Sequence, residues 1–242
     1  MRRVAQFVII IALPIFLLLT NVRLLMTTAF LRYEYGQASF PAAAEFTPAQ
    51  RMAIAQTTLA YVRGHADLET LRRLPYREKE VTHLVDVRLL TGQAVTLHWL
   101  TGGLLLLSLL FLARTPTTRS LAARSLLYGC GLTLVLLGAV ALVVTVHFDG
   151  FFVRFHRLFF VGDSWLFDVS DTLIQLFPVP FWFDAALGLA LLPMVEALVV
   201  GLGSCILHPV SVIRLGRSRG SRWQCPERPR TDGRSGPPGR PA

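Results

Sequence analysis

The chain alternates between long apolar runs and shorter polar segments. Four of the runs reach the length of about 20 residues that an α-helix needs to cross the hydrocarbon core of a bilayer. The second and third runs contain no charged residue, and the fourth contains one, Glu196. The pattern therefore predicts an all-α membrane protein with four transmembrane helices, a helical extracytoplasmic segment and an aromatic interfacial loop. The predicted spans are 4–22, 94–113, 125–147 and 185–207.

The positions of arginine predict the orientation of these spans, because cytoplasmic loops of membrane proteins are enriched in Lys and Arg. Arg2 and Arg3 precede the first span, and the short loop between the second and third spans carries three arginines and no acid. Both termini are therefore expected in the cytoplasm. The outer segments are then 27–93, which has eight basic and seven acidic residues, and 148–184, which is net acidic.

A cleaved signal peptide is the alternative reading of the first run. Its apolar stretch is longer than the roughly 7–15 residues of a signal-peptide core. Asn21 and Arg23 also separate it from the small residues of 27–29 that would form a cleavage site. We therefore expect a retained helix.

Composition agrees with a membrane protein. The chain is 53% hydrophobic and 16% charged, whereas soluble domains carry about 25% charged residues. The net charge of +9 would suit nucleic acid, but segment 208–242 holds eight arginines against two acids and supplies +6 of it. We expect no nucleic-acid partner. Domain 1–207 is predicted to be followed by a basic, disordered cytoplasmic tail near anionic headgroups.

The first outer segment contains two predicted helices. Thr47 and Pro48 are typical of an N-cap and a first helical residue, and the helical pattern ends at Gly64. A second helical stretch covers 78–90. Within it His83 and Asp86 are three residues apart and share a face, so the carboxylate is in a position to orient the imidazole. A surface His–Asp pair without a function is the alternative.

The second outer segment is rich in Phe and Trp, which is typical of a chain lying in the membrane interface as one or two short helices. His156 lies within it, between Arg154 and Arg157. An aromatic membrane anchor explains the Phe and Trp residues but not the basic cluster among them. Two imidazoles on the same side of a bilayer are suited to acid–base chemistry on a lipid-linked group.

Four motifs, together with the order of the spans, make residues 1–207 similar to the bacterial lipoprotein intramolecular transacylase family. One departure is Val169-Ser170, where the family pattern has a proline. The motifs are His83-x-x-Asp86-Val87, Phe155-His156-x-x-Phe159-Phe160, Asp163-x-Trp165-Leu166-x-Asp168, and Asp171-x-Leu173-Ile174-x-x-Phe177-Pro178.

The resemblance implies an acyltransferase that moves the sn-2 acyl chain of a diacylglyceryl-cysteine to the α-amino group of the same N-terminal cysteine. The product is a lyso-form lipoprotein. The implied catalytic residues are His83 and His156. The partners would be diacylglyceryl-modified lipoproteins and membrane lipids, at the outer face of the bacterial cytoplasmic membrane. The expected supporting or substrate-binding residues are Asp86, Arg154, Arg157, Tyr33, Asp168 and Asp171.

The chemistry fits these residue types. Ester-to-amide transfer runs downhill, so no cofactor or metal is expected. The attacking amine has an ordinary pKa of about 7.7–8.0, and a base near neutrality helps to remove its proton while the leaving glycerol oxygen needs a proton back. The sequence does not assign the base and the acid between the two histidines.

Three other functions remain open from the sequence. His98 and His147 lie near the outer ends of two spans, where a bis-histidine haem protein would place its ligands. The alternative is that these two histidines anchor the helices or line the substrate site. A zinc site at His83, His156 and Asp86 is disfavoured by the neighbouring arginines. A non-catalytic membrane adaptor would tolerate replacement of the outer histidines.

Overall fold

The computed structural model describes residues 1–207, so the predicted basic tail lies outside the described residues. This part of the chain is helical and contains no strand, which confirms the predicted all-α class. Its helices are α1 (Arg2–Leu25), α2 (Thr28–Tyr35), α3 (Pro48–Val62), α4 (Leu68–Arg72), α5 (Glu78–Ala113), α6 (Pro116–Val146), α7 (Phe148–Phe159), α8 (Thr172–Leu176) and α9 (Val179–Leu207).

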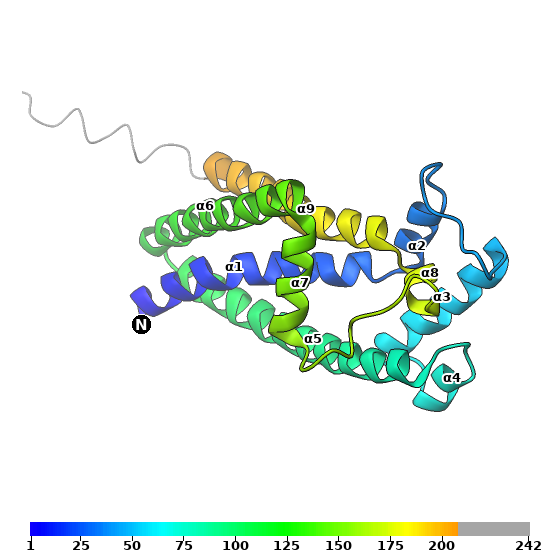
Figure 1. The fold of residues 1–242 in the computed structure, drawn as a ribbon. Coiled ribbons are helices and arrows are strands. Elements are labelled where there is room, and N and C mark those ends of the chain that lie inside the picture. The colour runs from blue at the N-terminus through cyan, green and yellow to red at the C-terminus, as the bar shows by residue number, and fades with distance from the viewer. Residues whose placement is uncertain (208–242) are drawn as a thin grey trace, which may run out of the picture. The chain divides into compact units, whose positions relative to one another are not determined.

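Helices α1, α5, α6 and α9 are long and apolar enough to cross a membrane, and they run side by side in one bundle (Figure 1). The prediction of four spans is confirmed. Helix α5 differs from the expectation, because the predicted helix over 78–90 and the predicted span over 94–113 form one helix of 36 residues. At 1.5 Å per residue such a helix is about 54 Å long, while the hydrocarbon core is about 30 Å thick. The first part of α5 therefore extends beyond the membrane.

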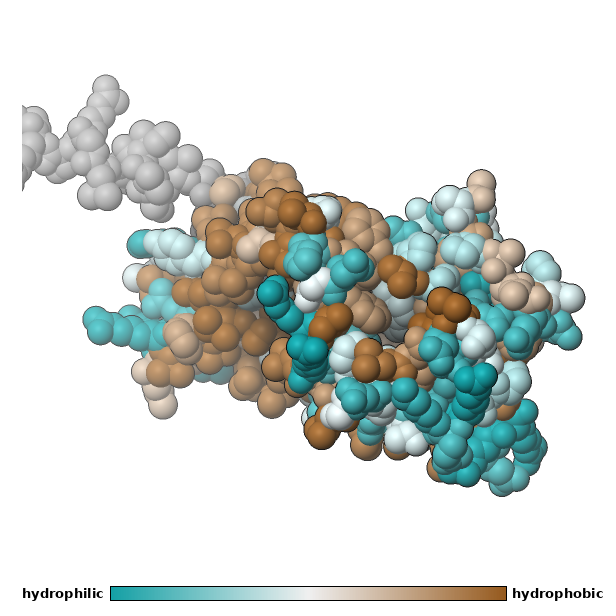
Figure 2. Space-filling view, viewed as in Figure 1, coloured by the Kyte–Doolittle hydropathy of each residue, from teal (hydrophilic) through white to brown (hydrophobic). Residues whose placement is uncertain are grey.

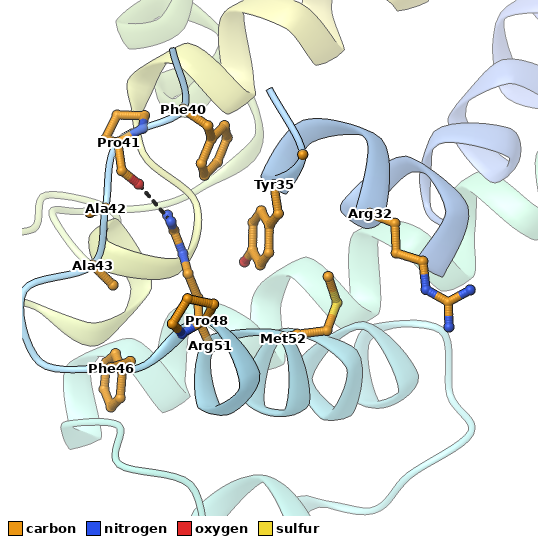
Figure 3. A pocket seen from close by; sticks show the side chains of 11 residues that line it. Arg32, Tyr35, Phe40, Pro41, Ala42, Ala43, Phe46, Pro48, Arg51 and Met52 are labelled. Carbon is orange, nitrogen blue, oxygen red and sulfur yellow. Dashed lines mark hydrogen bonds between the residues drawn. The ribbon is translucent and has the colours of Figure 1, made fainter. Parts of the chain in front are cut away.

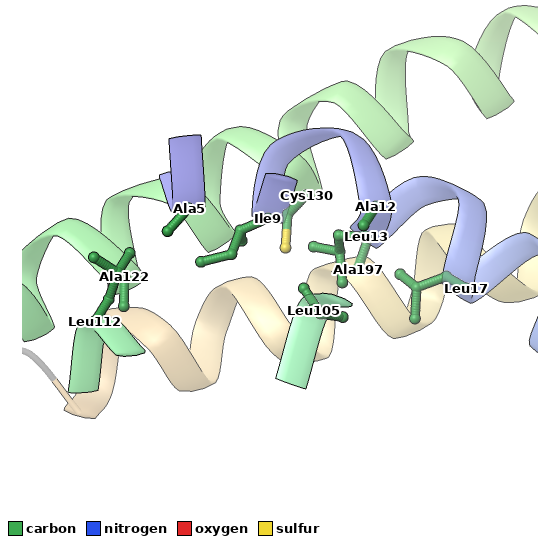
Figure 4. Close-up of a cluster of buried hydrophobic side chains, with 10 residues drawn as sticks. All are labelled: Ala5, Ile9, Ala12, Leu13, Leu17, Leu105, Leu112, Ala122, Cys130 and Ala197. Carbon is green, nitrogen blue, oxygen red and sulfur yellow. The ribbon is translucent and has the colours of Figure 1, made fainter. Parts of the chain in front are cut away.

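Helix α1 contacts the other three long helices. Figure 4 shows its side chains meeting those of α5, α6 and α9 in a buried apolar cluster. Gly102 permits a close approach between α5 and α1, because a Cβ atom there would lie 2.8 Å from the Phe16 ring. Small residues are commonly found where membrane helices pack this closely. The cluster is formed by Ala5, Ile9, Ala12, Leu13, Leu17, Leu105, Leu112, Ala122, Cys130 and Ala197.

The surface divides into an apolar part and a polar part. Figure 2 shows hydrophobic residues over the bundle and hydrophilic residues over the end that carries α2, α3 and α4. Exposed leucines such as Leu106 and Leu107 belong to the bundle surface. Exposed apolar side chains are unfavourable in water but suit a lipid environment, so the polar end forms a cap outside the bilayer.

The cap confirms the helix signals of the first outer segment. Thr47 caps α3 by accepting a hydrogen bond from the Gln50 backbone, and Gln50 bonds back to Thr47 in a capping box. Such a box satisfies two backbone donors that the helix itself leaves free. The cap has its own apolar cluster, in which Tyr61 and Leu71 pack with Val81 and Leu84 of α5. This cluster holds the extended part of α5 against the cap.

The second outer segment forms two short helices, as predicted. Helix α7 crosses the bundle from the end of α6 toward α5 (Figure 1). Phe148 and Phe152 form an aromatic contact on one side of it, whereas Arg154 and Arg157 are exposed on the other. Helix α7 therefore has the two-sided character of an interfacial helix, and it carries His156 to the side of α5.

Candidate active site

His83 and His156 lie next to one another at the end of the bundle that carries the cap. His83 is on the first part of α5, and His156 is in the last turn of α7. The centroids of the two rings are 6.1 Å apart and the ring planes differ by 26°. Only 6% of His83 and 8% of His156 is exposed. The fold therefore brings two imidazoles from distant parts of the sequence into one buried site.

Aromatic rings surround both histidines. The ring of His156 lies 4.1 Å from that of Phe152 and 5.0 Å from that of Trp165, measured between centroids. Phe160 contacts both imidazoles, with its centroid 4.8 Å from His83 and 5.5 Å from His156. Because these rings exclude water, electrostatic interactions within the site are stronger than at a solvated surface.

The two imidazoles differ in their hydrogen bonds. His156 donates a hydrogen bond from Nδ1 to the carbonyl oxygen of Phe152 at 2.8 Å, which leaves the lone pair on Nε2. In the described part of the chain, Nδ1 of His83 is buried and has no hydrogen-bond partner. Burial lowers the pKa of His156 below its ordinary value, and the bond to Phe152 opposes this shift. Burial thus favours the neutral form of His156.

An apolar cavity of about 230 Å³ adjoins His83. Its wall is formed by the ends of α1 and α9 that lie next to the cap, by α2, α3 and α8, and by α5 next to His83. His156 is not among its lining residues. The site thus has an apolar side at His83 and an aromatic side at His156.

Glu80 links the start of α5 to the first turn of α8. Its two carboxylate oxygens accept backbone hydrogen bonds from Arg77 at 2.7 Å and from Leu173 at 2.6 Å. Only 1% of Glu80 is exposed, so the loss of either bond would leave a buried polar group unpaired. Glu80 lies one turn before His83. Sequence reasoning missed it, because the partner backbone of Leu173 lies 93 positions away.

Asp171 joins the same two segments. It accepts hydrogen bonds from Arg77 Nη1 at 2.6 Å and from the Asp168 backbone at 2.8 Å, and it is 5% exposed. Thr172 Oγ1 donates to the Pro75 carbonyl at 2.6 Å. Together with Glu80, these contacts fix the segment bearing Trp165 and Phe167 over the histidines. The structure places Asp171 in the support of the site; its predicted contact with substrate stays a prediction.

The other predicted supporting residues lie around the histidine pair or farther away. Asp86 is half-buried on α5, and within residues 1–207 it does not bond to the buried Nδ1 of His83, which has no partner. The expected orienting contact is therefore not present in this structure. Arg154, Arg157, Tyr33 and Asp168 are all exposed, and Tyr33 stacks against Phe30. Their roles toward substrate stay predictions.

A second cavity, of about 530 Å³, lies between α2, the start of α3 and the linker that joins them, and shares no lining residue with the first (Figure 3). Arg51 crosses it, with its guanidinium 4.5 Å from the Tyr35 ring centroid and 4.6 Å from that of Phe40. Arg51 also donates to the Pro41 carbonyl at 2.6 Å. This arginine therefore holds the linker against α3.

His98 has a different environment from the two site histidines. Its Nε2 lies 3.0 Å from Thr20 Oγ1, and its Nδ1 lies 3.1 Å from an Arg23 guanidinium nitrogen. Both ring nitrogens are thus engaged by α1, so neither is available to bind haem iron. His98 anchors α5 to α1, as the alternative reading of this residue proposed. Among residues 1–207, no group of three His, Cys, Asp or Glu side chains is arranged to hold a metal ion.

The bundle, the cap and the buried imidazole pair define a multi-pass membrane protein with a histidine site at one end of its transmembrane helices. Residues 7–182 match the model of the lipoprotein intramolecular transacylase (Lit) family. The chain therefore belongs to this family of membrane acyltransferases. The family-level resemblance seen in the sequence motifs is confirmed.

The relatives agree with this assignment in length and fold. An uncharacterized protein of Aquifex aeolicus is 24% identical over 208 residues, which is 83% of this chain and 93% of that protein. The solved lipoprotein intramolecular transacylase Lit of Bacillus cereus is 20% identical and has a TM-score of 0.76, covering 86% of this chain and 95% of that one. A structure of the same protein with one histidine changed to alanine has a TM-score of 0.65.

Proposed function

We propose that this acyltransferase moves the sn-2 acyl chain of a diacylglyceryl-modified lipoprotein to the α-amino group of the same N-terminal cysteine, with His83 and His156 as its catalytic residues. The reaction takes place on the outer face of the bacterial cytoplasmic membrane, and both termini are cytoplasmic. The arginine pattern of the loops supports this orientation. The observation that carries the proposal is the pair of buried imidazoles, 6.1 Å apart, beside an apolar cavity.

The hydrogen bond of His156 supports its assignment as the general base. His156 is held by the Phe152 carbonyl with Nε2 as its free lone pair, so it accepts the proton from the attacking amine. The amine nitrogen then forms the new bond to the acyl carbon, and the ester C–O bond breaks. The protonated His156 returns the proton to the leaving glycerol oxygen, which balances the reaction without any other proton source.

His83 acts at the ester carbonyl in this proposal. It lines the apolar cavity, whereas His156 does not, and a neutral imidazole donates one hydrogen bond. Donated to the carbonyl oxygen, that bond grows stronger as negative charge develops in the tetrahedral intermediate. Because the amine and the ester belong to one substrate molecule, the site gains the advantage of proximity without holding two molecules together.

The test is tandem mass spectrometry of the N-terminal peptide of a reporter lipoprotein. The reporter is produced in a bacterial host that leaves lipoproteins diacylated, with and without this protein. Intact mass does not distinguish substrate from product, because the transfer yields an isomer, so the fragments must locate each acyl chain. The proposal expects an N-acyl fragment together with a monoacylglyceryl thioether.

Two variants extend this test to the histidines. His83→Asn and His156→Gln should insert into the membrane and leave the reporter in its diacylglyceryl form, with a free α-amino group. An unchanged diacylglyceryl peptide with the wild-type protein present would refute the proposed reaction and favour an adaptor. Full activity of either variant would instead remove that histidine from the mechanism.

A further inference from the structure

The cavity beside His83 has a wall suited to a hydrocarbon chain. Among the described residues that line it, no side chain is an acid, a lysine or an arginine. The polar side chains in its wall include His83, Thr58 and Thr91. The hydroxyl of Thr58 is already bonded to the Ile54 carbonyl at 2.9 Å and to Tyr76 at 2.7 Å. The remaining wall is mostly aliphatic and aromatic. Such a cavity stabilises an apolar occupant by removing it from water.

The cavity has a direction that follows from the helix faces around it. His83, Val87 and Thr91 line it from α5 at intervals of four residues, so they lie on one face over about 12 Å of helix. Ala185 and Leu189 line it from α9 at the same interval. Along α5, the cavity therefore begins at the imidazole and continues toward the transmembrane part of the bundle.

This arrangement matches a lipid whose polar group is at His83 and whose tail follows the helices into the outer leaflet. The diacylglyceryl substrate has two chains that differ in fate, since one is transferred and the other stays on glycerol. Only the transferred chain has to bring its carbonyl carbon to the catalytic histidines. We propose that the cavity beside His83 binds the sn-2 acyl chain, with its ester carbonyl at His83.

This assignment rests on the proposed function and adds which chain is bound and where. It predicts that the residues lining the cavity determine the acceptable length of the sn-2 chain but not that of the sn-1 chain. Ala185 is 9% exposed and faces the cavity, so a phenylalanine at this position would fill part of the space that the tail occupies.

The experiment compares wild-type protein with Ala185→Phe on synthetic diacylglyceryl lipopeptides in vesicles of phosphatidylethanolamine and phosphatidylglycerol. One peptide carries palmitoyl at both positions, and two others carry octanoyl at either sn-2 or sn-1. Ala185→Phe should lower kcat/KM about tenfold or more for the peptide with palmitoyl at sn-2, as a mismatch in an apolar pocket does. An octanoyl chain at sn-2 should restore the rate, and an octanoyl chain at sn-1 should not.

The matched control is Val195→Phe, which adds a similar bulk to α9 at a position that is 58% exposed and away from the cavity. It should keep the wild-type preference. Thr91→Phe, on the α5 wall, replaces Ala185→Phe if that variant does not fold. Restoration by octanoyl at sn-1, or identical rates for cavity and control variants, would overturn the assignment. Failure of wild-type protein to form N-acyl product from any peptide would instead refute the proposed function.

Discussion

Helix α5 carries two buried histidines that differ in their hydrogen bonds and in their neighbours. His83 and His98 are 6% and 7% exposed. His98, in the transmembrane part, has both ring nitrogens within hydrogen-bond distance of α1 side chains and stacks on Phe16. His83, in the part that extends into the cap, has a buried nitrogen without a partner in the described structure, a second imidazole at 6.1 Å and an adjoining cavity.

The comparison shows that burial alone does not identify a catalytic histidine. A fully hydrogen-bonded ring contributes to stability and has no capacity left for a substrate. A buried ring with an unpaired nitrogen costs stability, and that cost is typical of residues kept for function. We therefore expect replacement of His83 to affect the reaction and replacement of His98 to affect the fold.

The largest effect is expected at the site histidines. His83→Asn and His156→Gln should each lower the rate of N-acyl product formation by about 10²–10⁴-fold, the usual contribution of general acid–base catalysis. Their thermal unfolding in detergent should remain close to that of wild type. A variant that loses activity only because it unfolds would show a lower melting temperature, and that result would count against a catalytic role.

A smaller loss of activity is expected from Glu80→Gln. An amide at this position replaces one of the two acceptor oxygens by a donor, which faces a backbone N–H of Arg77 or Leu173. The site then shifts, and a displacement of about 1 Å can cost about 10²-fold in rate. We expect kcat to fall while KM for the lipopeptide changes little.

The control for this variant is Glu78→Gln, two residues earlier on α5. Glu78 forms an exposed ion pair with Arg72, and such pairs contribute about 0–1 kcal/mol. Its kcat should match that of wild type. Equal kcat values for the two glutamine variants would show that Glu80 does not position the site.

His98→Leu should have the opposite profile to the site variants. It removes the contacts to Thr20 and Arg23, and leaving such groups unpaired costs about 1–3 kcal/mol. The melting temperature should fall, whereas kcat measured on the folded fraction should not. A loss of kcat in the folded protein would mean that the polar contact between α1 and α5 also takes part in the reaction.

The smallest effect is expected from Glu34→Gln, in the cap. Burial, and after it the neighbouring Asp184, together raise the pKa of Glu34 from its ordinary value to about 7. A carboxyl with a raised folded-state pKa favours the fold at low pH, and this contribution is lost as the pH rises through the folded-state pKa. Wild-type protein should therefore lose thermal stability more steeply than Glu34→Gln between pH 4.5 and about 7, the range between the ordinary and the folded-state pKa of this carboxyl. Parallel curves for the two proteins would contradict this.

The sequence predicts the four spans and helix α3 of the cap, because they depend on local signals, but it does not predict α2 and α4. Apolar runs of sufficient length identify the four spans, and Thr47 with Pro48 identifies the start of α3. The continuity of α5 is not predicted, because a polar segment next to an apolar run suggests two elements where the helix in fact passes from the cap into the bundle. The two histidines are found through their motifs and their expected side of the membrane.

The supports of the site are not predictable from local patterns. Glu80 bonds to a backbone group 93 positions away, and Arg51 lies between two aromatic rings of the preceding segment. In the sequence each looks like an ordinary charged residue on a helix. The aspartate–histidine contact expected from the spacing of His83 and Asp86 is absent from the described structure, because shared helix face does not fix the side-chain direction.

The measurement that tests the central claim most directly is a double-mutant cycle on single-turnover formation of the N-acyl peptide. Wild type, His83→Asn, His156→Gln and the double variant are compared in the same vesicles. If the two imidazoles act as one catalytic unit, the double variant should be about as slow as the slower single variant, since residues that act together have non-additive effects. Multiplicative losses in the double variant would show that the two histidines act independently and would contradict the account.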